Sequence, residues 1–391
     1  MHTLHTERLP VKLWLDDPED GAIKQIRNIA NLPFAYHHIA IMPDCHEGFG
    51  MPIGGVLATS GVIIPNAVGV DIGCGMCAIK TDLQHIDRKH LLSTVELIRK
   101  TVPVGFKHHN KPQDQQLMPA GYEVESMRIV SQEYQSALHQ VGTLGGGNHF
   151  IEIQKGSDGH IWLMIHSGSR NIGLKVADHY NRLAGRLNEA WGVAQFKKQQ
   201  LAYLPLDSDE GIAYNNEMQY CIEFAFANRK LMARRVSEIM YDITGCDFLP
   251  FEGNELINIA HNYASTEAHF NKEVIVHRKG ATSAQKGQLG IIPGSQGSKS
   301  YIVWGKGNPD SFNSCSHGAG RKMGRKEAQR KLNLMAERSR LDKMGIIHAL
   351  NTVRDLDEAA GAYKDIDQVM KLQTDLVEPI IELKPLAVVK G

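Results

Sequence analysis

The sequence predicts a globular protein of the α+β class. Along its 391 residues, expected strands and helices alternate without the regular βαβ period of a doubly wound sheet. Hydrophobic residues make up 42% of the chain and charged residues 22%, which excludes the disordered, collagen-like and coiled-coil classes. No internal repeat, low-complexity tract or linker marks a domain boundary.

Hydrophobic periodicity and turn residues predict the elements in order. An almost unbroken run of apolar residues and glycine over 61–79 is typical of a strand buried on both faces. The clearest helical stripe, within 210–242, contains Met218 and Ile222 and ends before Gly245. The expected strands are 11–15, 39–42, 54–57, 149–154, 161–166, 273–277, 300–304 and 378–389, and the expected helices are 20–31, 88–101, 210–242, 321–338 and 364–373, with a polar loop over 107–119.

Charge and cysteine usage limit the class of function. Basic and acidic side chains balance at 43 each, so a polyanion site requires a local excess of charge. The six cysteines form no CxxC pair, the N-terminus lacks a signal-peptide pattern, and no apolar run of about 18 residues predicts a membrane span. We therefore expect a cytoplasmic protein. Its 19 histidines and 37 glycines point to metal ligation and to close approach of a ligand to the backbone.

Asp71 and Cys74 are the first candidate metal ligands. They lie three residues apart at the end of the apolar run, beside Gly73 and Gly75. A carboxylate and a thiolate suit a borderline metal, and a thiolate can bridge two ions. The alternative is a buried core cysteine, which is the common fate of a free thiol.

Three consecutive glycines, 145–147, precede a second group of polar residues. Glycine is costly inside a regular element, so this run favours close approach of a ligand. If 148–152 is extended, Asn148 and Glu152 share one face of the strand and His149 points to the other. The strand could then serve a metal on one side and a polar ligand on the other. An ordinary hairpin turn is the alternative.

Two further histidines are candidate ligands. His166 precedes Ser-Gly-Ser-Arg170 at the junction of an expected strand and helix, where free N–H groups and the Arg170 guanidinium suit an anion. An ordinary helix N-cap is the alternative. His261 is a weaker candidate, because an isolated histidine is more often a hydrogen-bonded core residue.

The last segment combines a small-residue anion nest with a histidine. The nest, 293–300, lacks the full spacing of a Walker A loop. His317 lies between serines and glycines, where it can act as nucleophile, base or ligand. Residues 321–343 then carry nine basic and three acidic side chains, which suits either a phosphate backbone or a solvated helix face. Together the segments predict a metal-dependent phosphoryl-transfer site.

These segments together resemble the RtcB-type RNA-splicing ligases. The resemblance runs from Met42-Pro-Asp-Cys-His46 and Pro65-Asn-Ala-Val-Gly-Val-Asp-Ile-Gly-Cys-Gly75 to Tyr363-Lys-Asp-Ile-Asp367 and Val388-Val-Lys-Gly391. It covers almost the whole chain and implies one catalytic domain over 1–391, with a β-rich core around the active site and peripheral helices. Gly146, Cys45 and Glu47 depart from the family pattern without removing a ligand, which suggests a subfamily with its own RNA substrate.

The resemblance also implies roles for individual residues. In the family a cysteine bridges two Mn²⁺ ions, so Cys74 would complete one site with Asp71 and His149 and the other with His166 and His261. His317 would become guanylylated, and Arg170 and Arg321 would contact RNA phosphates. The guanine nucleotide would be held by Asn148, His149, Phe150, Ile151, Glu152, His261, Asn262, Pro293, Gly294, Ser295, Gln296, Ser300, His317, Gly318, Ala319, Gly320 and Lys390.

The implied activity is GTP-dependent RNA ligation by a monomer, in tRNA splicing or RNA repair. An RNA end with a 2′,3′-cyclic phosphate or 3′-phosphate is joined to a 5′-hydroxyl end through a guanylylated histidine and an RNA-(3′)pp(5′)G intermediate. A dinuclear-metal phosphoesterase is the alternative, although hydrolysis needs no covalent histidine. An RNA-binding protein with a structural metal is a further rival, but five ligands exceed the closed four of a structural zinc site.

Overall fold

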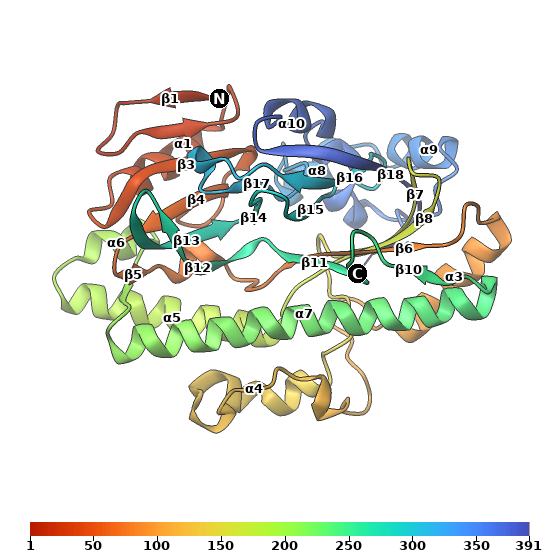
Figure 1. Ribbon diagram of the computed structural model, residues 1–391, viewed down its shortest axis with the longest axis horizontal. Helices are drawn as coiled ribbons and strands as arrows, with labels where there is room; N and C mark the ends of the chain where they lie inside the picture. Colours follow the sequence, from red (N-terminus) through yellow and green to blue (C-terminus); the bar gives the residue numbers. More distant parts are fainter. Residues whose placement is uncertain (391) are drawn as a thin grey trace.

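Two large β-sheets form the centre of the computed structural model, which describes residues 1–390 (Figure 1). The six-stranded sheet has the order β1 (His2–Leu4), β2 (Val11–Leu13), β3 (Ala35–His46), β4 (Ile53–Thr59), β13 (Lys272–Lys279) and β12 (Asn262–His269). The eight-stranded sheet has the order β10 (Phe248–Leu249), β6 (Gly75–Thr81), β8 (Ile161–Ser167), β7 (Phe150–Gly156), β18 (Val377–Lys390), β16 (Ser300–Gly305) and β15 (Leu289–Ile292), with β11 (Ile257–Ala260) also paired to β6. Two short pairs join β14 (Ala281–Ser283) to β17 (Ser314–Ser316) and β5 (Val62–Ile63) to β9 (Leu204–Pro205).

Strand direction confirms the α+β class. Neighbouring strands of the two large sheets pair antiparallel, apart from β2 and β3, which are parallel. A doubly wound fold would instead require a mainly parallel sheet. The predicted strands and helices are confirmed to within a few residues at their ends, apart from the two corrections below.

Helices lie around the sheets, and the longest runs along most of the molecule beneath them (Figure 1). This helix is α7 (Asp209–Thr244), which begins at the Ser208 cap and ends at Gly245, whose backbone is left-handed with φ 69°. The other helices are α1 (Asp20–Ala30), α2 (Pro65–Val68), α3 (Arg88–Thr101), α4 (Arg128–Leu138), α5 (Arg170–Ala190), α6 (Ala194–Lys198), α8 (Arg325–Lys331), α9 (Leu334–Lys343) and α10 (Ile366–Leu372). Among the described residues, no helix combines the length and apolar character needed to cross a membrane.

Helix α7 divides its apolar residues between two parts of the core. Its first half, including Met218 and Ile222, packs with α4 and α5. Its second half, including Met232 and Val236, packs with α3 and one face of the eight-stranded sheet. The predicted stripe is confirmed, and it makes α7 a scaffold beneath the strands that carry the candidate site.

The apolar run over 61–79 is not one core strand, which corrects the sequence prediction. Strand β5 is followed by helix α2, which begins with Pro65, and then by a turn before β6 starts at Gly75. Gly69 and Gly73 in this turn have φ of 100° and 72°, a conformation that residues with a side chain rarely adopt. The turn places Asp71 and Cys74 just before β6.

The helix predicted over 321–338 is two shorter helices, α8 and α9, displaced toward the C-terminus. Leu332 and Asn333 between them are extended, and the Asn333 side chain accepts a hydrogen bond from the backbone N–H of Ala336. An asparagine that caps the second helix therefore interrupts the basic run.

Helix α4 was not predicted, because only a short stripe of its residues is apolar.

Candidate functional site

A cavity of about 1010 Å³ is lined by residues of both large sheets and of the segment that leads into α8. Most of the predicted site residues lie on its wall. These are Asp71, Cys74, Asn148, Phe150, Glu152, His166, His261, Asn262, Pro293, Gly294, Ser295, Gln296, His317, Gly318, Ala319, Gly320, Arg321 and Lys390. Segments separated by more than 300 residues in the sequence thus meet around one space.

Three of the remaining predicted residues lie just outside the cavity wall. His149 is 5% exposed and contacts Cys74, whereas Ile151 packs in the hydrophobic core. Asn148, Phe150 and Glu152 do line the cavity, but β7 begins only at Phe150, so Asn148 and His149 precede the strand and the predicted extended segment 148–152 is shorter than expected. Ser300 is buried, and its hydroxyl accepts a hydrogen bond of 3.2 Å from the backbone N–H of Gly294. This bond stabilises the 293–300 segment from the side away from the cavity.

Arg170 also lies outside the cavity wall, and its guanidinium connects two loops. It donates to the carbonyl oxygen of Gly105 and to the hydroxyl of Thr143, each at 3.1 Å. A side chain at Gly145 would meet this guanidinium, because an added Cβ would lie 2.1 Å from its Nη1 atom. The contact that Arg170 was expected to make with RNA phosphate stays a prediction.

The five predicted metal ligands lie together. The Cys74 Sγ atom is 3.4 Å from His149 Nε2 and 3.3 Å from His166 Nε2, and all three side chains are buried. Asp71 Oδ2 lies 3.1 Å from His149 Nε2 on one side of the thiol. On the other side, His261 Nε2 lies 3.3 Å from His166 Nε2.

These distances fit shared metal ions. Donor atoms bound tetrahedrally to one ion at about 2.0 to 2.3 Å are about 3.3 to 3.6 Å apart. The Cys74–His149, Cys74–His166 and His166–His261 spacings match this range, and the donor atoms of Cys74, His149 and His166 all lie within 4.8 Å of one another. Sulfur, nitrogen and carboxylate donors together suit a borderline divalent metal.

The protonation of the ligands agrees with a metal site. Burial lowers the pKa of His166 and of His261, so both rings are neutral and keep a lone pair for a metal. Burial, followed by the nearby Asp71 carboxylate, raises the pKa of the Cys74 thiol well above its ordinary value. A Cys74 thiolate therefore requires a bound cation to offset its charge.

Helix α7 fixes the backbone that carries these ligands. The fully buried Arg229 donates at 2.9 Å to the carbonyl oxygen of Gly73 and at 2.8 Å to that of Ser167, the neighbours of Cys74 and His166. Charge-assisted hydrogen bonds of this kind are stronger than neutral ones. One side chain of the scaffold helix thus connects the backbone next to Cys74 with the backbone next to His166, at the end of the β6–β8 pair.

His317 follows β17 and is oriented by Asp44, which the sequence analysis did not select. The His317 ring Nδ1 lies 2.6 Å from the Asp44 Oδ2 atom, which also accepts the backbone N–H of His317 at 3.0 Å. With Nδ1–H donated to the carboxylate, Nε2 carries the lone pair. The His317 ring centroid is 4.8 Å from that of His261, so the His317 ring lies next to the candidate metal ligands. Asp44 lies within the early Met42–His46 motif, which was the available signal.

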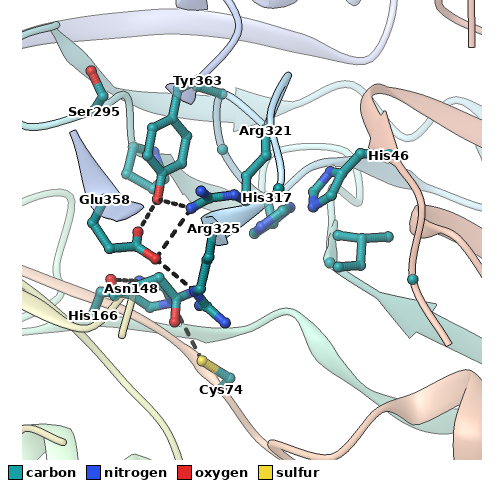
Figure 2. Close-up of a pocket in the computed structure, with 18 of the residues that line it drawn as sticks. His46, Cys74, Asn148, His166, Ser295, His317, Arg321, Arg325, Glu358 and Tyr363 are labelled. Atoms are coloured by element: carbon teal, nitrogen blue, oxygen red, sulfur yellow. Dashed lines mark hydrogen bonds and ion pairs between the residues drawn. The ribbon is translucent and has the colours of Figure 1, made fainter. Parts of the chain in front are cut away.

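Basic side chains and one tyrosine converge on Glu358, as Figure 2 shows. Arg321 Nη1 and Arg325 Nε lie 3.2 and 3.0 Å from its carboxylate, the Tyr363 hydroxyl donates to it, and Lys390 Nζ is 3.9 Å away. Burial opposes ionisation of Glu358, but Lys390 and then the two arginines outweigh it and lower its pKa. Three cations around one carboxylate leave a positive cavity wall, which suits phosphate groups. Glu358 is the last residue of a 3₁₀ helix, Val353–Glu358, and no local pattern indicated it.

The basic stretch 321–343 contacts the cavity through its first half. Cavity-lining residues extend from Arg321 through the start of α8 to Lys326 and Arg330. Lys331 instead pairs with Glu327 at 2.6 Å. The basic residues of α9 are not part of the cavity wall.

The fold and the site define an α+β protein with a candidate metal centre, an oriented histidine and a candidate anion nest. The family model RtcB, tRNA-splicing ligase RtcB, matches residues 25–391, and the chain belongs to this family. It is similar to the RNA-splicing ligase RtcB of Escherichia coli strain K12, with 38% identity over 99% of both chains. The tRNA-splicing ligase RtcB of Thermococcus kodakarensis is 31% identical over 98% of this chain and 95% of the relative. The RNA-splicing ligase RtcB of Mycobacterium tuberculosis is 31% identical over 94% of this chain and 100% of the relative.

Proposed function

We propose that this protein is a GTP-dependent RNA ligase that joins a 3′-phosphate or 2′,3′-cyclic phosphate end to a 5′-hydroxyl end. Family membership and the names of its relatives support the class of reaction. The observation that carries the proposed mechanism is the free Nε2 of His317, oriented by Asp44 beside five metal donors. We take the enzyme to act as a cytoplasmic monomer in tRNA splicing or RNA repair.

The first step forms a covalent bond on His317. Its Nε2 lone pair attacks the α-phosphorus of GTP, a phosphorus–nitrogen bond forms, and pyrophosphate leaves. The Asp44 carboxylate accepts a hydrogen bond from His317 Nδ1–H, so the proton stays on the ring, and the carboxylate stabilises the positive charge that the ring acquires. Two Mn²⁺ ions held by Asp71, Cys74 and the three ligand histidines would supply Lewis-acid neutralisation of phosphate charge.

The later steps use the positive wall around Glu358. A 2′,3′-cyclic phosphate end is first hydrolysed: a water oxygen bonds to phosphorus, the P–O2′ bond breaks and a proton goes to O2′, which leaves a 3′-phosphate. GMP then passes from His317 to the RNA 3′-phosphate, which gives RNA-(3′)pp(5′)G, and the 5′-hydroxyl displaces GMP to form the phosphodiester. Arg321, Arg325 and Lys390 hold the phosphates during both transfers. The carboxylate of Glu152 suits the N–H donors of guanine and the face of Phe150 suits stacking. The remaining cavity residues named above, from Asn148 to Gly320, complete the nucleotide site.

A dinuclear-metal phosphoesterase is the second candidate function. It would use the same ligands and the hydrolytic step alone. The Asp44–His317 pair argues against it, because hydrolysis of a phosphoester at two metals needs no oriented covalent histidine.

Incubation with α-labelled GTP and Mn²⁺, followed by a denaturing gel, tests the proposal. We expect the wild-type protein to retain the label and His317→Ala to lose it entirely, while Mn²⁺ binding by equilibrium dialysis stays unchanged. His90→Ala is the matched control, because His90 lies on the exposed face of α3. Full labelling of His317→Ala would contradict the assignment. Cyclic-phosphate hydrolysis without any label in the wild type would favour the phosphoesterase.

A further inference from the structure

Phe106 is the most exposed large apolar side chain of the described residues. Its side chain is 102% exposed, whereas the other phenylalanines are packed in the core or line the cavity. A phenyl ring left in water forgoes the favourable free energy of burial. Nothing in the metal cluster or the nucleotide cavity accounts for this position.

The Phe106 ring is presented by a tightly held turn. Residues 104–107 form a turn closed by a backbone hydrogen bond of 3.2 Å between its first and last members, and Gly105 has φ 65°. The backbone N–H of Gly105 donates to the carbonyl oxygen of Gly145 at 2.9 Å, and its carbonyl accepts from Arg170 at 3.1 Å. Because both polar groups of Gly105 are engaged, the backbone that carries Phe106 is held in place before any ligand binds.

The turn lies next to the glycine loop that borders the cavity. A Cβ atom added at Gly146 would lie 3.6 Å from the Gly105 Cα, and one added at Gly147 would lie 3.3 Å from Nη2 of Arg325. Arg325 is part of the cavity wall. A strip of backbone without side chains therefore connects the positive cavity wall to the turn that carries Phe106.

The charges beside Phe106 favour an anionic partner. Lys107, His108 and Lys111 follow it on the same loop and are exposed. Exposed aromatic rings interleaved with basic side chains are typical of sites for single-stranded nucleic acid, where bases stack and cations hold phosphates. A protein-docking patch would instead gather several apolar side chains, and the sequence neighbours of Phe106 are a glycine and a lysine.

We propose that Phe106 is a stacking platform for a base of the RNA strand that leaves the cavity over the 145–147 loop. Lys107 and Lys111 hold the phosphates of that strand. The inference rests on the proposed function, because it requires an RNA end to react in the cavity. Either the 3′-phosphate strand or the 5′-hydroxyl strand offers the base, and the experiment distinguishes them.

Binding of two short single-stranded RNAs tests the proposal, one with a 3′-phosphate and one with a 5′-hydroxyl, each carrying 2-aminopurine near that end. Phe106→Ala should weaken binding of one strand about 5- to 150-fold, the range expected for loss of one base–aromatic stack. Phe106→Trp should keep the affinity and the quenching of 2-aminopurine. Trp191→Ala, an exposed aromatic at the opposite end of α5 from Arg170, is the control and should bind RNA like the wild type.

The salt dependence of RNA affinity distinguishes a stacking contact from a contact between a basic side chain and a phosphate. Phe106→Ala should leave the slope of log affinity against log salt unchanged, whereas Lys107→Ala should reduce it by about 0.7, the value for one phosphate contact on a single strand. Guanylylation of His317 should continue in both variants.

The binding and ligation results test the Phe106 platform and the proposed ligase function separately. Quenching of one strand alone, lost in Phe106→Ala, supports the platform and assigns that strand to it. A wild-type protein that ligates RNA while Phe106→Ala binds both strands with unchanged affinity would overturn the platform and leave the ligase function standing. A wild-type protein that neither binds nor ligates RNA would overturn the proposed function itself.

Discussion

The orientation of the His317 ring is set by one oxygen atom of Asp44. That atom accepts both the ring Nδ1–H and the backbone N–H of His317, so it sets the tautomer and the ring orientation together. The carboxylate is fully buried, which strengthens its effect on a positively charged ring. Asp44 is a positioning residue, because it acts through His317.

Replacement of this carboxylate should slow formation of the covalent adduct. Asp44→Asn preserves the size of the side chain but removes the negative charge that stabilises the ring after attack. We expect the rate of label transfer from GTP to fall by up to about 10⁴-fold, as for a buried aspartate–histidine pair in other enzymes. Mn²⁺ binding should stay unchanged, and the exposed Asp16→Asn serves as control. An unchanged rate would show that Asp44 does not set the tautomer.

The burial of Glu152 should make the stability of the protein depend on pH. Burial raises its pKa to about 8, above the value of about 4.3 for an exposed glutamate. Between these values the folded protein binds a proton that the unfolded chain has released, so stability falls as pH rises, by at most about 1.4 kcal/mol per pH unit.

The variant Glu152→Gln cannot ionise and should escape this loss. Its melting temperature relative to the wild type should increase from about pH 5 to pH 8 and then level off, because the native carboxylate is fully ionised above its pKa. Thermal unfolding without GTP, at a series of pH values, measures this difference in melting temperature. Glu238→Gln, at an exposed glutamate of α7, should show no such trend. A constant difference for Glu152→Gln would mean that its pKa is not raised.

At the scale of elements, four positions of α8 line the cavity, Arg325, Lys326, Glu327 and Arg330, and α9 contributes none. Lys326 and Arg330 line the cavity from one face of α8, whereas Arg340 and Lys343 lie exposed on α9. The even charge balance of the whole chain means that any affinity for RNA has to come from local surfaces of this kind.

Charge reversal on the two helices should therefore have different effects. Lys326→Glu combined with Arg330→Glu should weaken RNA binding and lower the slope of log affinity against log salt by about 1.4, the value for two lost phosphate contacts. Arg340→Glu combined with Lys343→Glu is the matched control, and we expect it to change RNA affinity and the salt slope less. Guanylylation of His317 should continue in both. Equal effects of the two pairs would place the RNA outside the cavity mouth.

At the scale of the whole molecule, a bound metal would connect distant parts of the chain. The five donors run from Asp71 to His261, with His166 in β8 and the other four in loop positions next to strands. A ligand that binds only the folded state stabilises it by mass action. Metal binding should therefore be visible as global stability.

Mn²⁺ should raise the melting temperature of the protein, and a chelator should reverse the shift. At a concentration 100-fold above the dissociation constant, one ion adds about 2.7 kcal/mol to the free energy of unfolding. Cys74→Ala should lose most of this shift, because the Cys74 sulfur lies 3.4 Å from His149 Nε2 and 3.3 Å from His166 Nε2, at the centre of the donor cluster. Cys246→Ala, at a buried cysteine near the end of α7, should keep it. A full shift in Cys74→Ala would rule out a bridging role.

Local sequence determined the α+β class, most of the strands and helices, and the set of side chains able to bind a metal. Periodicity, capping residues and donor chemistry are properties of short segments, and they are readable without the fold. The same locality explains the errors, since Pro65 and Gly69 within 61–79 and Asn333 after 321 interrupt elements that the apolar and charge patterns extend.

Only the tertiary structure decided which groups act on one another. Asp44 reaches His317 across 273 residues of sequence, and Glu358 collects Arg321, Arg325 and Lys390. Tertiary packing also turned Arg170 toward Gly105 and left Phe106 exposed beside the glycine loop. Such pairings depend on how two sheets and α7 pack, and the free energy that selects them is distributed over the whole core rather than encoded in any short segment.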